Sequence, residues 1–237
     1  MALPSISSLN WAVHFTLYQR FWLATIFTFI ICPVRIQPRL NHFGGDLRDY
    51  TFIDQHLNTL LQSIYPEPIS PQHKAGTKEV LEKFVRPRLG ILHTVLDVGC
   101  GQGVAEPFFR EMGIIWTGIT LGVDYTVCKQ AGLNVLERDF NFAFFEDESF
   151  DLVYARHSLE HSPMPPVSLL EFKRIARHFI LVVVPTPESG SHYPNHYSVM
   201  PDIGWRNLFR NTGLSILESE ETKGQEPELR YLLSKNV

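Results

Sequence analysis

Short apolar runs alternate with segments of helical spacing over the C-terminal two thirds of the chain. Seven apolar runs are typical of short buried strands, and apolar residues recur every three or four positions between most of them. The predicted strands cover residues 94–98, 114–120, 134–138, 150–154, 178–184, 214–218 and 229–234. The predicted helices cover residues 77–85, with Thr77 as a candidate N-cap, and residues 104–112, 125–131, 167–176 and 203–211.

This alternation predicts an α/β fold with a mainly parallel sheet, because each parallel connection needs a crossover of helix length. No segment of helix length separates the last two predicted strands, so we expect them to close the sheet as a C-terminal antiparallel hairpin. The whole pattern therefore predicts a Rossmann-like, doubly wound, seven-stranded mixed sheet.

The N-terminal third of the chain has a different composition. Residues 21–34 (FWLATIFTFIICPV) form the most hydrophobic stretch of the sequence. Residues 35–75 are rich in Pro, Asn, Asp and His, with one short helix predicted near 52–64. We therefore divide the chain into an apolar segment with an irregular linker, residues 1–75, and a folded domain, residues 76–237.

Residues 11–34 are long enough to insert into a membrane, which needs about 20 apolar residues. They include Arg20, however, and a charged residue in the middle of a membrane helix costs roughly 2.5–3.5 kcal/mol. Three interpretations follow: a membrane anchor, an apolar helix packed on the domain, or sequence outside the fold. Arg35 and Arg39 follow the segment and would keep an anchored domain cytoplasmic. We therefore expect a cytoplasmic protein, with membrane contact through residues 11–34 if the segment inserts.

The composition excludes several classes of protein. The chain has 237 residues, of which 44% are hydrophobic, so it can bury a sizeable core and does not resemble a disordered chain. Its net charge is −4 and it contains no run of Lys or Arg, so we expect no nucleic-acid partner. Its three cysteines lie far apart in the sequence, which favours a reducing compartment over a disulfide framework.

A glycine-rich loop, residues 97–103 (DVGCGQG), follows the first strand of the predicted domain. Ligands of doubly wound sheets bind beyond the carboxyl ends of the strands, at turns of this kind. No Gly-Lys-Ser/Thr follows, which excludes a P-loop, and Val104 stands where a dinucleotide-binding loop has its third glycine. Asp97 would repel a phosphate, but it suits a ligand with an ammonium group such as S-adenosylmethionine.

Three segments of the predicted domain occur in an order and spacing that resemble a known family. They are residues 95–103 (VLDVGCGQG), 137–140 (ERDF) and 147–161 (DESFDLVYARHSLEH). Together they resemble the class I S-adenosylmethionine-dependent methyltransferases over residues 77–235. The later stretches NHYSV and PELRYLL are similar to small phage and bacterial members. The resemblance implies an enzyme that uses S-adenosylmethionine as cofactor and transfers its methyl group by in-line displacement.

The resemblance also implies roles for individual residues. Asp97 contacts the ammonium group of the methionine part, and the glycines let the main chain lie along the cofactor. Asp139 accepts a hydrogen bond from the adenine amino group, with Phe140 beside the ring. Many members hold the ribose hydroxyls with an acid after the second strand, and here Thr120 or Asp124 is the candidate. The implied cofactor-binding residues are Asp97, Gly99, Cys100, Gly101, Gln102, Gly103, Thr120, Asp139, Phe140 and Arg156.

Two histidines are candidates for catalysis. His157 follows the fourth predicted strand, where the resemblance places the sulfonium, and His161 lies four residues on. Histidine titrates near neutral pH, so either residue is a candidate general base. The run from His157 to His161 also matches the zinc-protease pattern H-x-x-E-H. The prolines at positions 163, 165 and 166 would end a helix there, so we expect no metal.

The acceptor of the methyl group is less well defined by the sequence. The loop of residues 190–200, after the fifth predicted strand, contributes His196 and Tyr197 as candidate substrate-binding residues. The run ARHSLEH replaces the Pro-Pro-aromatic signature of enzymes that methylate amino groups of bases, so we expect a small-molecule acceptor. Two other functions fit the same residues: a non-catalytic module that binds S-adenosylmethionine, and a nicotinamide-dependent oxidoreductase. The sequence leaves the oligomeric state open.

Overall fold

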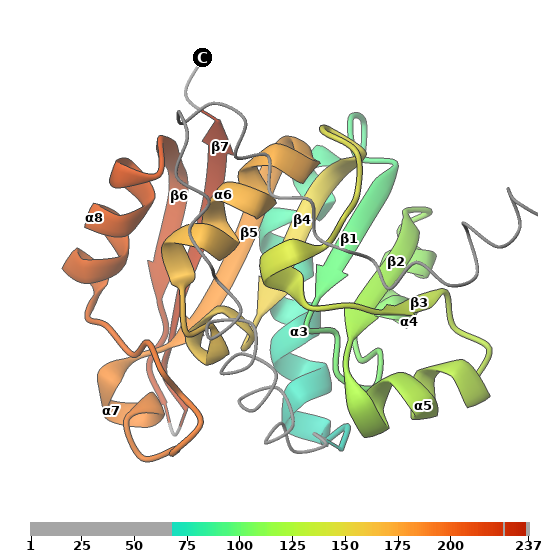
Figure 1. Cartoon of the computed structure of the whole chain (residues 1–237), viewed down its shortest axis with the longest axis horizontal. Coiled ribbons are helices and arrows are strands. Elements are labelled where there is room, and N and C mark those ends of the chain that lie inside the picture. The colour runs from blue at the N-terminus through green and yellow to red at the C-terminus, as the bar shows by residue number, and fades with distance from the viewer. Residues whose placement is uncertain (1–67, 225, 236–237) are drawn as a thin grey trace, which may run out of the picture. The chain divides into compact units, whose positions relative to one another are not determined.

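A seven-stranded mixed sheet with helices on both faces makes up the described part of this computed structural model, residues 68–224 and 226–235 (Figure 1). The strands are β1 (Thr94–Val98), β2 (Ile115–Thr120), β3 (Val135–Glu137), β4 (Phe150–Arg156), β5 (Ala176–Pro185), β6 (Leu214–Glu221) and β7 (Glu228–Lys235). They lie in the order β3-β2-β1-β4-β5-β7-β6. Strand β7 runs antiparallel to both of its neighbours, and the other four pairs are parallel.

Helices connect most of the strands. The α-helices are α3 (Pro71–Phe84), α4 (Glu106–Glu111), α5 (Gly122–Gln130), α6 (Pro165–Ile175), α7 (Pro187–Gly190) and α8 (Asp202–Asn211). Three short 3-10 helices also occur: η1 (Arg86–Arg88), η2 (Phe140–Phe142) and η3 (Leu159–His161). The predicted doubly wound, seven-stranded mixed sheet with its C-terminal antiparallel hairpin is therefore confirmed.

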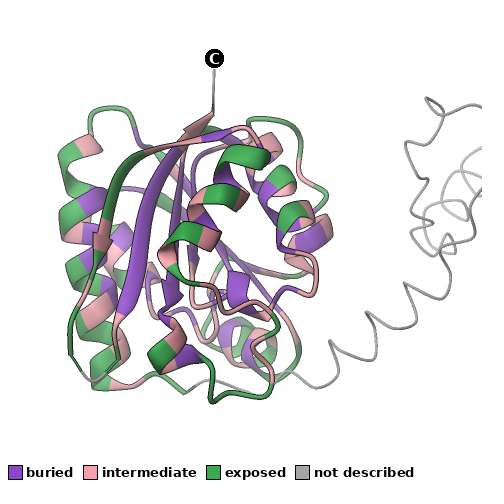
Figure 2. Cartoon of the chain, turned by 90° about the vertical axis from the view of Figure 1, so that its left-hand side faces the viewer, coloured by how far each residue is buried: buried purple, intermediate pink, exposed green. Residues whose placement is uncertain are grey.

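The hydrophobic core consists of two layers, one on each face of the sheet. One layer joins the strands to α6 and α8, through side chains such as Phe172 and Trp205. The other layer joins them to α3, α4 and α5, through side chains such as Leu81 and Phe109. Figure 2 shows the buried residues on the strands and on the inward sides of the helices. The central parallel strands β1 and β4 are buried along most of their length because both of their faces are covered.

The first helix of the domain begins earlier than the sequence predicted. Ser70 is its N-cap, and the Ser70 hydroxyl accepts a hydrogen bond from the main-chain N–H of His73 at 3.0 Å. Pro71 occupies the first helical turn, where the missing N–H costs nothing. Thr77, the predicted N-cap, is instead buried within α3. The cluster of prolines before residue 72 was interpreted as linker, although a Ser-Pro pair also suits a helix start.

The prediction of a cytoplasmic protein with a membrane contact needs correction. Among residues 68–224 and 226–235, no helix is long and apolar enough to cross a membrane. Residues 11–34, on which the prediction rested, and the helix predicted near 52–64 lie outside the described residues. Membrane association therefore finds no support, and we withdraw it.

Candidate active site

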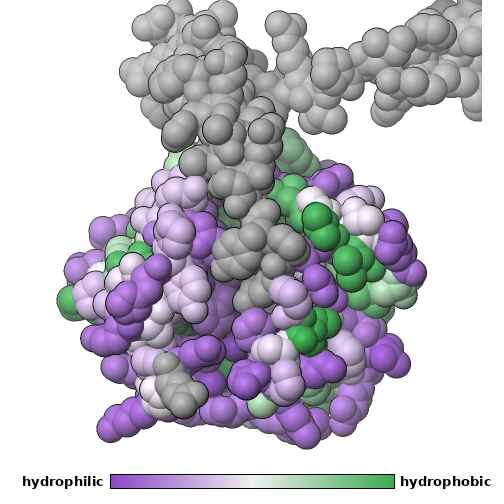
Figure 3. Space-filling view, turned by 90° about the horizontal axis from the view of Figure 1, so that it is seen from below, coloured by the Kyte–Doolittle hydropathy of each residue, from purple (hydrophilic) through white to green (hydrophobic). Residues whose placement is uncertain are grey.

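The site lies where the strand order reverses direction. β1 pairs with β2 on one side and with β4 on the other, so that Asp97 lies opposite both Gly118 and Tyr154. Connections leave this point in opposite directions, and the carboxyl ends of the strands enclose a crevice there. The loop after β1 and the residues after β4 therefore meet. Figure 3 looks onto this edge of the sheet, where the visible surface is mostly hydrophilic with smaller hydrophobic groups.

The glycines after β1 are required by both conformation and packing. Gly99, Gly101 and Gly103 have φ values of +64°, +52° and +80°. Residues with a Cβ atom rarely adopt this backbone conformation. A Cβ atom on Gly99 would lie 2.6 Å from Cβ of Ser158, which follows β4. A Cβ atom on Gly103 would lie 2.6 Å from Cδ1 of Leu133. Gly99 thus lets the loop approach the segment after β4, and Gly103 lets it pack against the chain before β3.

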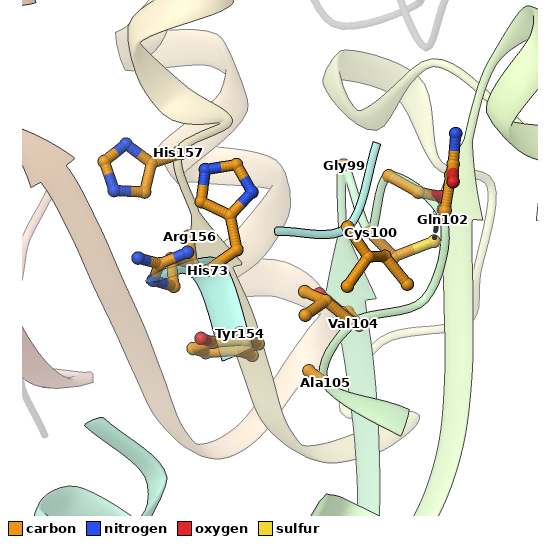
Figure 4. Close-up of a pocket in the computed structure, with 12 residues that line it drawn as sticks. His73, Gly99, Cys100, Gln102, Val104, Ala105, Tyr154, Arg156 and His157 are labelled. Atoms are coloured by element: carbon orange, nitrogen blue, oxygen red, sulfur yellow. Dashed lines mark hydrogen bonds between the residues drawn. The ribbon is translucent and has the colours of Figure 1, made fainter. Parts of the chain in front are cut away.

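A pocket lies between this loop and the segment after β4. In Figure 4, Gly99, Cys100 and Gln102 lie on one side of the pocket, and Arg156 and His157 lie on the other. The structure thus brings together seven of the residues predicted for the site: Asp97, Gly99, Cys100, Gly101, Gln102, Arg156 and His157. It adds five that sequence reasoning missed: Ile69, His73, Val104, Ala105 and Tyr154.

Asp97 presents a buried carboxyl group to the pocket. The residue is only 3% exposed, and its Oδ2 accepts a hydrogen bond from Nε1 of Trp116 at 2.9 Å. Burial disfavours the charged form and raises the pKa of Asp97 to about 7, although the Trp116 hydrogen bond and the Arg156 charge act in the opposite direction. A cation bound in the pocket would restore the charged form.

A buried ionic network holds Arg156 and His157, which line the opposite side of the pocket. Oε1 of Glu228 accepts a hydrogen bond from Nη2 of Arg156 at 2.7 Å and lies 2.7 Å from Nε2 of His157. Its Oε2 accepts a hydrogen bond from Nε of Arg230 at 3.0 Å. Nδ1 of His157 lies 3.3 Å from Oε1 of Glu160. Glu228 therefore joins three cationic side chains behind the pocket.

The two carboxylates determine the charge of His157. Burial alone would lower the pKa of His157, but Glu160 and Glu228 raise it to about 9. His157 also has a φ of +51°, a backbone conformation that is rare for a residue with a side chain and that clusters at functional sites. At neutral pH, His157 is thus a cation whose two ring nitrogens both face carboxylates.

The residues predicted to bind the ribose and the adenine do not line this pocket. Thr120 ends β2 and is 9% exposed, and Asp124 of α5 accepts a hydrogen bond from Nε2 of the pocket residue Gln102 at 3.1 Å. Asp139 caps η2 by accepting hydrogen bonds from Asn141, and burial raises the pKa of Asp139. The ring of Phe140 packs against the core, 6.1 Å from that of Phe172 between centroids.

The remaining predicted residues, His161, His196 and Tyr197, lie outside the lining of the pocket. The rings of His161 and His196 are in edge-to-face contact, with 4.7 Å between their centroids. Nδ1 of His161 lies 3.1 Å from the carbonyl oxygen of Asn195. Tyr197 is 44% exposed.

Glu228 is the main residue that sequence reasoning missed. It is the first residue of β7 and is 5% exposed. Because β7 runs antiparallel, its first residue lies at the edge where the parallel strands end, level with Pro185 of β5. The predicted antiparallel hairpin could have indicated this position. A final strand that runs opposite to the parallel strands must begin at the edge of the sheet where those strands end.

Comparisons with known proteins were made for the whole chain. Residues 67–219 match the family model of the methyltransferase domain. No curated protein matches the sequence. Three solved structures illustrate the likeness in fold. The cyclase SpnF is 18% identical with a TM-score of 0.61, over 79% of this chain and 94% of that one.

The other two structures are methyltransferases. Magnesium protoporphyrin IX methyltransferase from Synechocystis PCC 6803, with bound S-adenosylhomocysteine, is 14% identical with a TM-score of 0.57, over 79% of this chain and 100% of that one. An S-adenosylmethionine-dependent methyltransferase from Archaeoglobus fulgidus is 16% identical with a TM-score of 0.55, over the same shares. At such low sequence identities, the structural similarity shows a shared fold and nothing further. Because the family model covers more than half of the chain, the protein belongs to the methyltransferase-domain family, as a class I enzyme with S-adenosylmethionine as its cofactor.

Proposed function

We propose that the protein transfers the methyl group of S-adenosylmethionine to a small-molecule acceptor by in-line displacement, with the amino-acid end of the cofactor against Asp97. The buried carboxyl group of Asp97 on the glycine-loop pocket carries this proposal. A cationic ligand group would compensate its charge, and glycines without Cβ atoms allow the main chain to approach the ligand. The residues present therefore fit the cofactor.

The remaining predicted residues extend the proposed cofactor site along the carboxyl ends of β1, β2 and β3. Asp124 is linked to the pocket through its hydrogen bond with Gln102, which supports a position for the ribose there. Asp139, on the chain after β3, is the proposed acceptor for the adenine amino group, and Phe140 follows it. When bound, the cofactor supplies an activated methyl group on sulfur. The protein's contribution is to align the acceptor with that group and to exclude water.

The acceptor side of the pocket is proposed to be the wall formed by Arg156 and His157. Both side chains are cationic at neutral pH and are fixed by Glu228. The acidic net charge and the lack of a basic run support a small molecule over a nucleic acid as acceptor. That His157 or His161 acts as the general base stays a prediction, and His157 would first have to lose the proton that Glu160 and Glu228 stabilise. Because His157 alone of the two lines the pocket, we assign contact with the acceptor to His157.

Calorimetric titration of the full chain tests the proposed cofactor site. We expect S-adenosylhomocysteine to bind at micromolar concentrations, because it carries the same ammonium and adenosine groups as the cofactor. NAD serves as the parallel ligand, and we expect no binding, since its pyrophosphate would meet the Asp97 carboxyl group. Binding of NAD with equal affinity, or of neither ligand, would contradict the proposal.

Replacing His157 with Ala tests the acceptor side separately. We expect the variant to lose turnover while its affinity for S-adenosylhomocysteine stays within about a factor of three, because Asp97 and the glycine loop are unchanged. His93→Ala, before β1 and outside the pocket lining, is the matched control. Unchanged methyl transfer by the His157 variant, from S-adenosylmethionine to acceptors in cell extracts or to candidate acceptors, would contradict this assignment.

A further inference from the structure

A second cluster of side chains lies beside the proposed cofactor pocket. Glu160 and His161 belong to η3, and His196 lies in the loop between α7 and α8. One ligand-type atom from each of the three lies within 4.8 Å of the other two. The cluster thus joins a segment after β4 to a loop more than thirty residues further along the chain.

The carboxylate of this cluster lacks ordinary hydrogen-bond partners. Glu160 is 0% exposed, and neither of its oxygens has a hydrogen-bond partner within the described part of the chain. His157 approaches Oε1 at 3.3 Å, but as an ion-pair contact without the alignment of a hydrogen bond. The His157 charge faces Oε1, but both buried oxygens keep lone pairs without a hydrogen-bond donor, which is costly. The position of this carboxylate within reach of two imidazoles favours a bound ion as the missing partner.

Contacts with main-chain carbonyl oxygens determine the tautomer of both histidines. Nδ1 of His161 lies 3.1 Å from the carbonyl oxygen of Asn195, and Nδ1 of His196 lies 2.8 Å from that of Gly190. A carbonyl oxygen only accepts, so each Nδ1 must carry the proton and each Nε2 keeps its lone pair. Histidines that bind metals typically donate their second ring N–H in this way, which fixes the tautomer and the ring.

We propose that Glu160, His161 and His196 bind a divalent transition-metal ion, with Zn²⁺ the best match. Two imidazole nitrogens and one carboxylate oxygen are a ligand set of catalytic zinc sites, which leave a fourth position open. Mg²⁺ and Ca²⁺ prefer sites built from oxygen alone. The open position would take a water molecule.

This site differs from the zinc pattern that the sequence analysis set aside. That pattern paired His157 with His161 on a helix, whereas Nε2 of His157 lies 2.7 Å from Glu228. In the proposed ligand set, His196 from a distant loop replaces His157. The prolines after residue 162 exclude a longer helix there. The proposed ligand set does not need one, because Glu160 and His161 lie on η3, a single 3-10 turn. Metal binding would also tie the loop of His196 to the segment after β4.

Metal content and affinity test the proposal without an activity assay. The full chain, freed of any affinity tag and treated with a chelator, is titrated with Zn²⁺ in competition with a chromophoric chelator. We expect about one tightly bound ion per chain, and four-coordinate Co²⁺ to give the intense visible absorption of such sites. Removing a ligand in His196→Ala should weaken Zn²⁺ binding about 100-fold or more.

His192→Ala is the matched control, since His192 is an exposed histidine of the same loop outside the cluster. It should bind Zn²⁺ as the unaltered chain does. Binding of S-adenosylhomocysteine by the His196 variant would show that it is folded, and neither metal readout depends on the proposed cofactor site. Failure of the unaltered chain to bind Zn²⁺, or equal binding by the His196 variant, would overturn the proposal.

Discussion

Replacing Asp97 with Asn is expected to weaken binding of S-adenosylhomocysteine by about 30-fold, or about 2 kcal/mol, the typical loss of a hydrogen bond to a charged group. Asn keeps the shape of the side chain, and its amide oxygen still accepts the hydrogen bond from Nε1 of Trp116. The change therefore removes the negative charge from the pocket and little else. Isothermal titration calorimetry of both proteins measures the difference.

The pH dependence of binding gives a second test of Asp97. Burial raises its pKa to about 7, so the free protein carries mainly the neutral acid at pH 6. An ammonium group selects the carboxylate, and binding at pH 6 must therefore release a proton. We expect the dissociation constant to fall as the pH rises from 6 to 7.5, and then to level off. The Asn variant should lose both the pH dependence and the proton release.

Asp147→Asn is the control for a general loss of negative charge, because Asp147 is paired with Arg174 and its side chain is 65% exposed. Its affinity for S-adenosylhomocysteine should match that of the unaltered protein at every pH. If the Asp97 variant bound as tightly as this control, Asp97 would not hold the ammonium group.

Replacing Glu228 with Gln is expected to reduce the free energy of unfolding by about 3–5 kcal/mol, the usual cost of removing one partner from a buried ionic network. The Glu228 side chain is 7% exposed, and those of Arg156 and Arg230 are 11% and 4% exposed. Gln leaves Arg156 without a carboxylate partner and removes one of the two carboxylates that face His157, whereas Arg230 keeps its ion pairs with Glu79 and Glu220. Urea denaturation, followed by tryptophan fluorescence, measures the loss.

Acid should reproduce part of this effect in the unaltered protein. Burial alone would raise the pKa of Glu228, but His157, Arg156 and Arg230 hold it well below its ordinary value of 4.5. Its contribution to stability is therefore complete above pH 4.5 and is lost as the pH falls below that value. Glu218→Gln removes an exposed ion pair with Arg88 and should change stability by less than about 1 kcal/mol. A loss no larger than this in Glu228→Gln would contradict the buried-network account.

The arrangement of the fold was predictable because the hydrophobic pattern of most segments agrees with their place in the sheet or against it. The apolar runs at 94–98 and 150–154 lie in buried strands, and turn residues bound them. Errors occurred where one local signal had two meanings. Pro71 suits both a linker and a first helical turn, and the hydrogen bond from the His73 N–H to the Ser70 hydroxyl places it in the helix.

The site was predictable only in part. The glycine loop lies within one continuous segment, so spacing alone identifies Asp97 and its neighbours. Contacts between distant segments leave no local pattern. Glu228 reaches His157 across 71 residues of sequence, and Glu160 and His196 meet through loop geometry. A sequence pattern also takes His157 for a neutral imidazole, because it does not reveal the two carboxylates that stabilise its protonated form.

The placement of β7 has a consequence for synthesis of the protein on the ribosome. β7 lies between β5 and β6, yet it leaves the exit tunnel after both of them. Until it emerges, β5 and β6 each keep an unpaired edge where β7 will pair, which is the kind of edge that promotes aggregation. The nascent chain therefore depends on its last described strand twice, to complete the sheet and to bring the Glu228 carboxylate to Arg156 and His157.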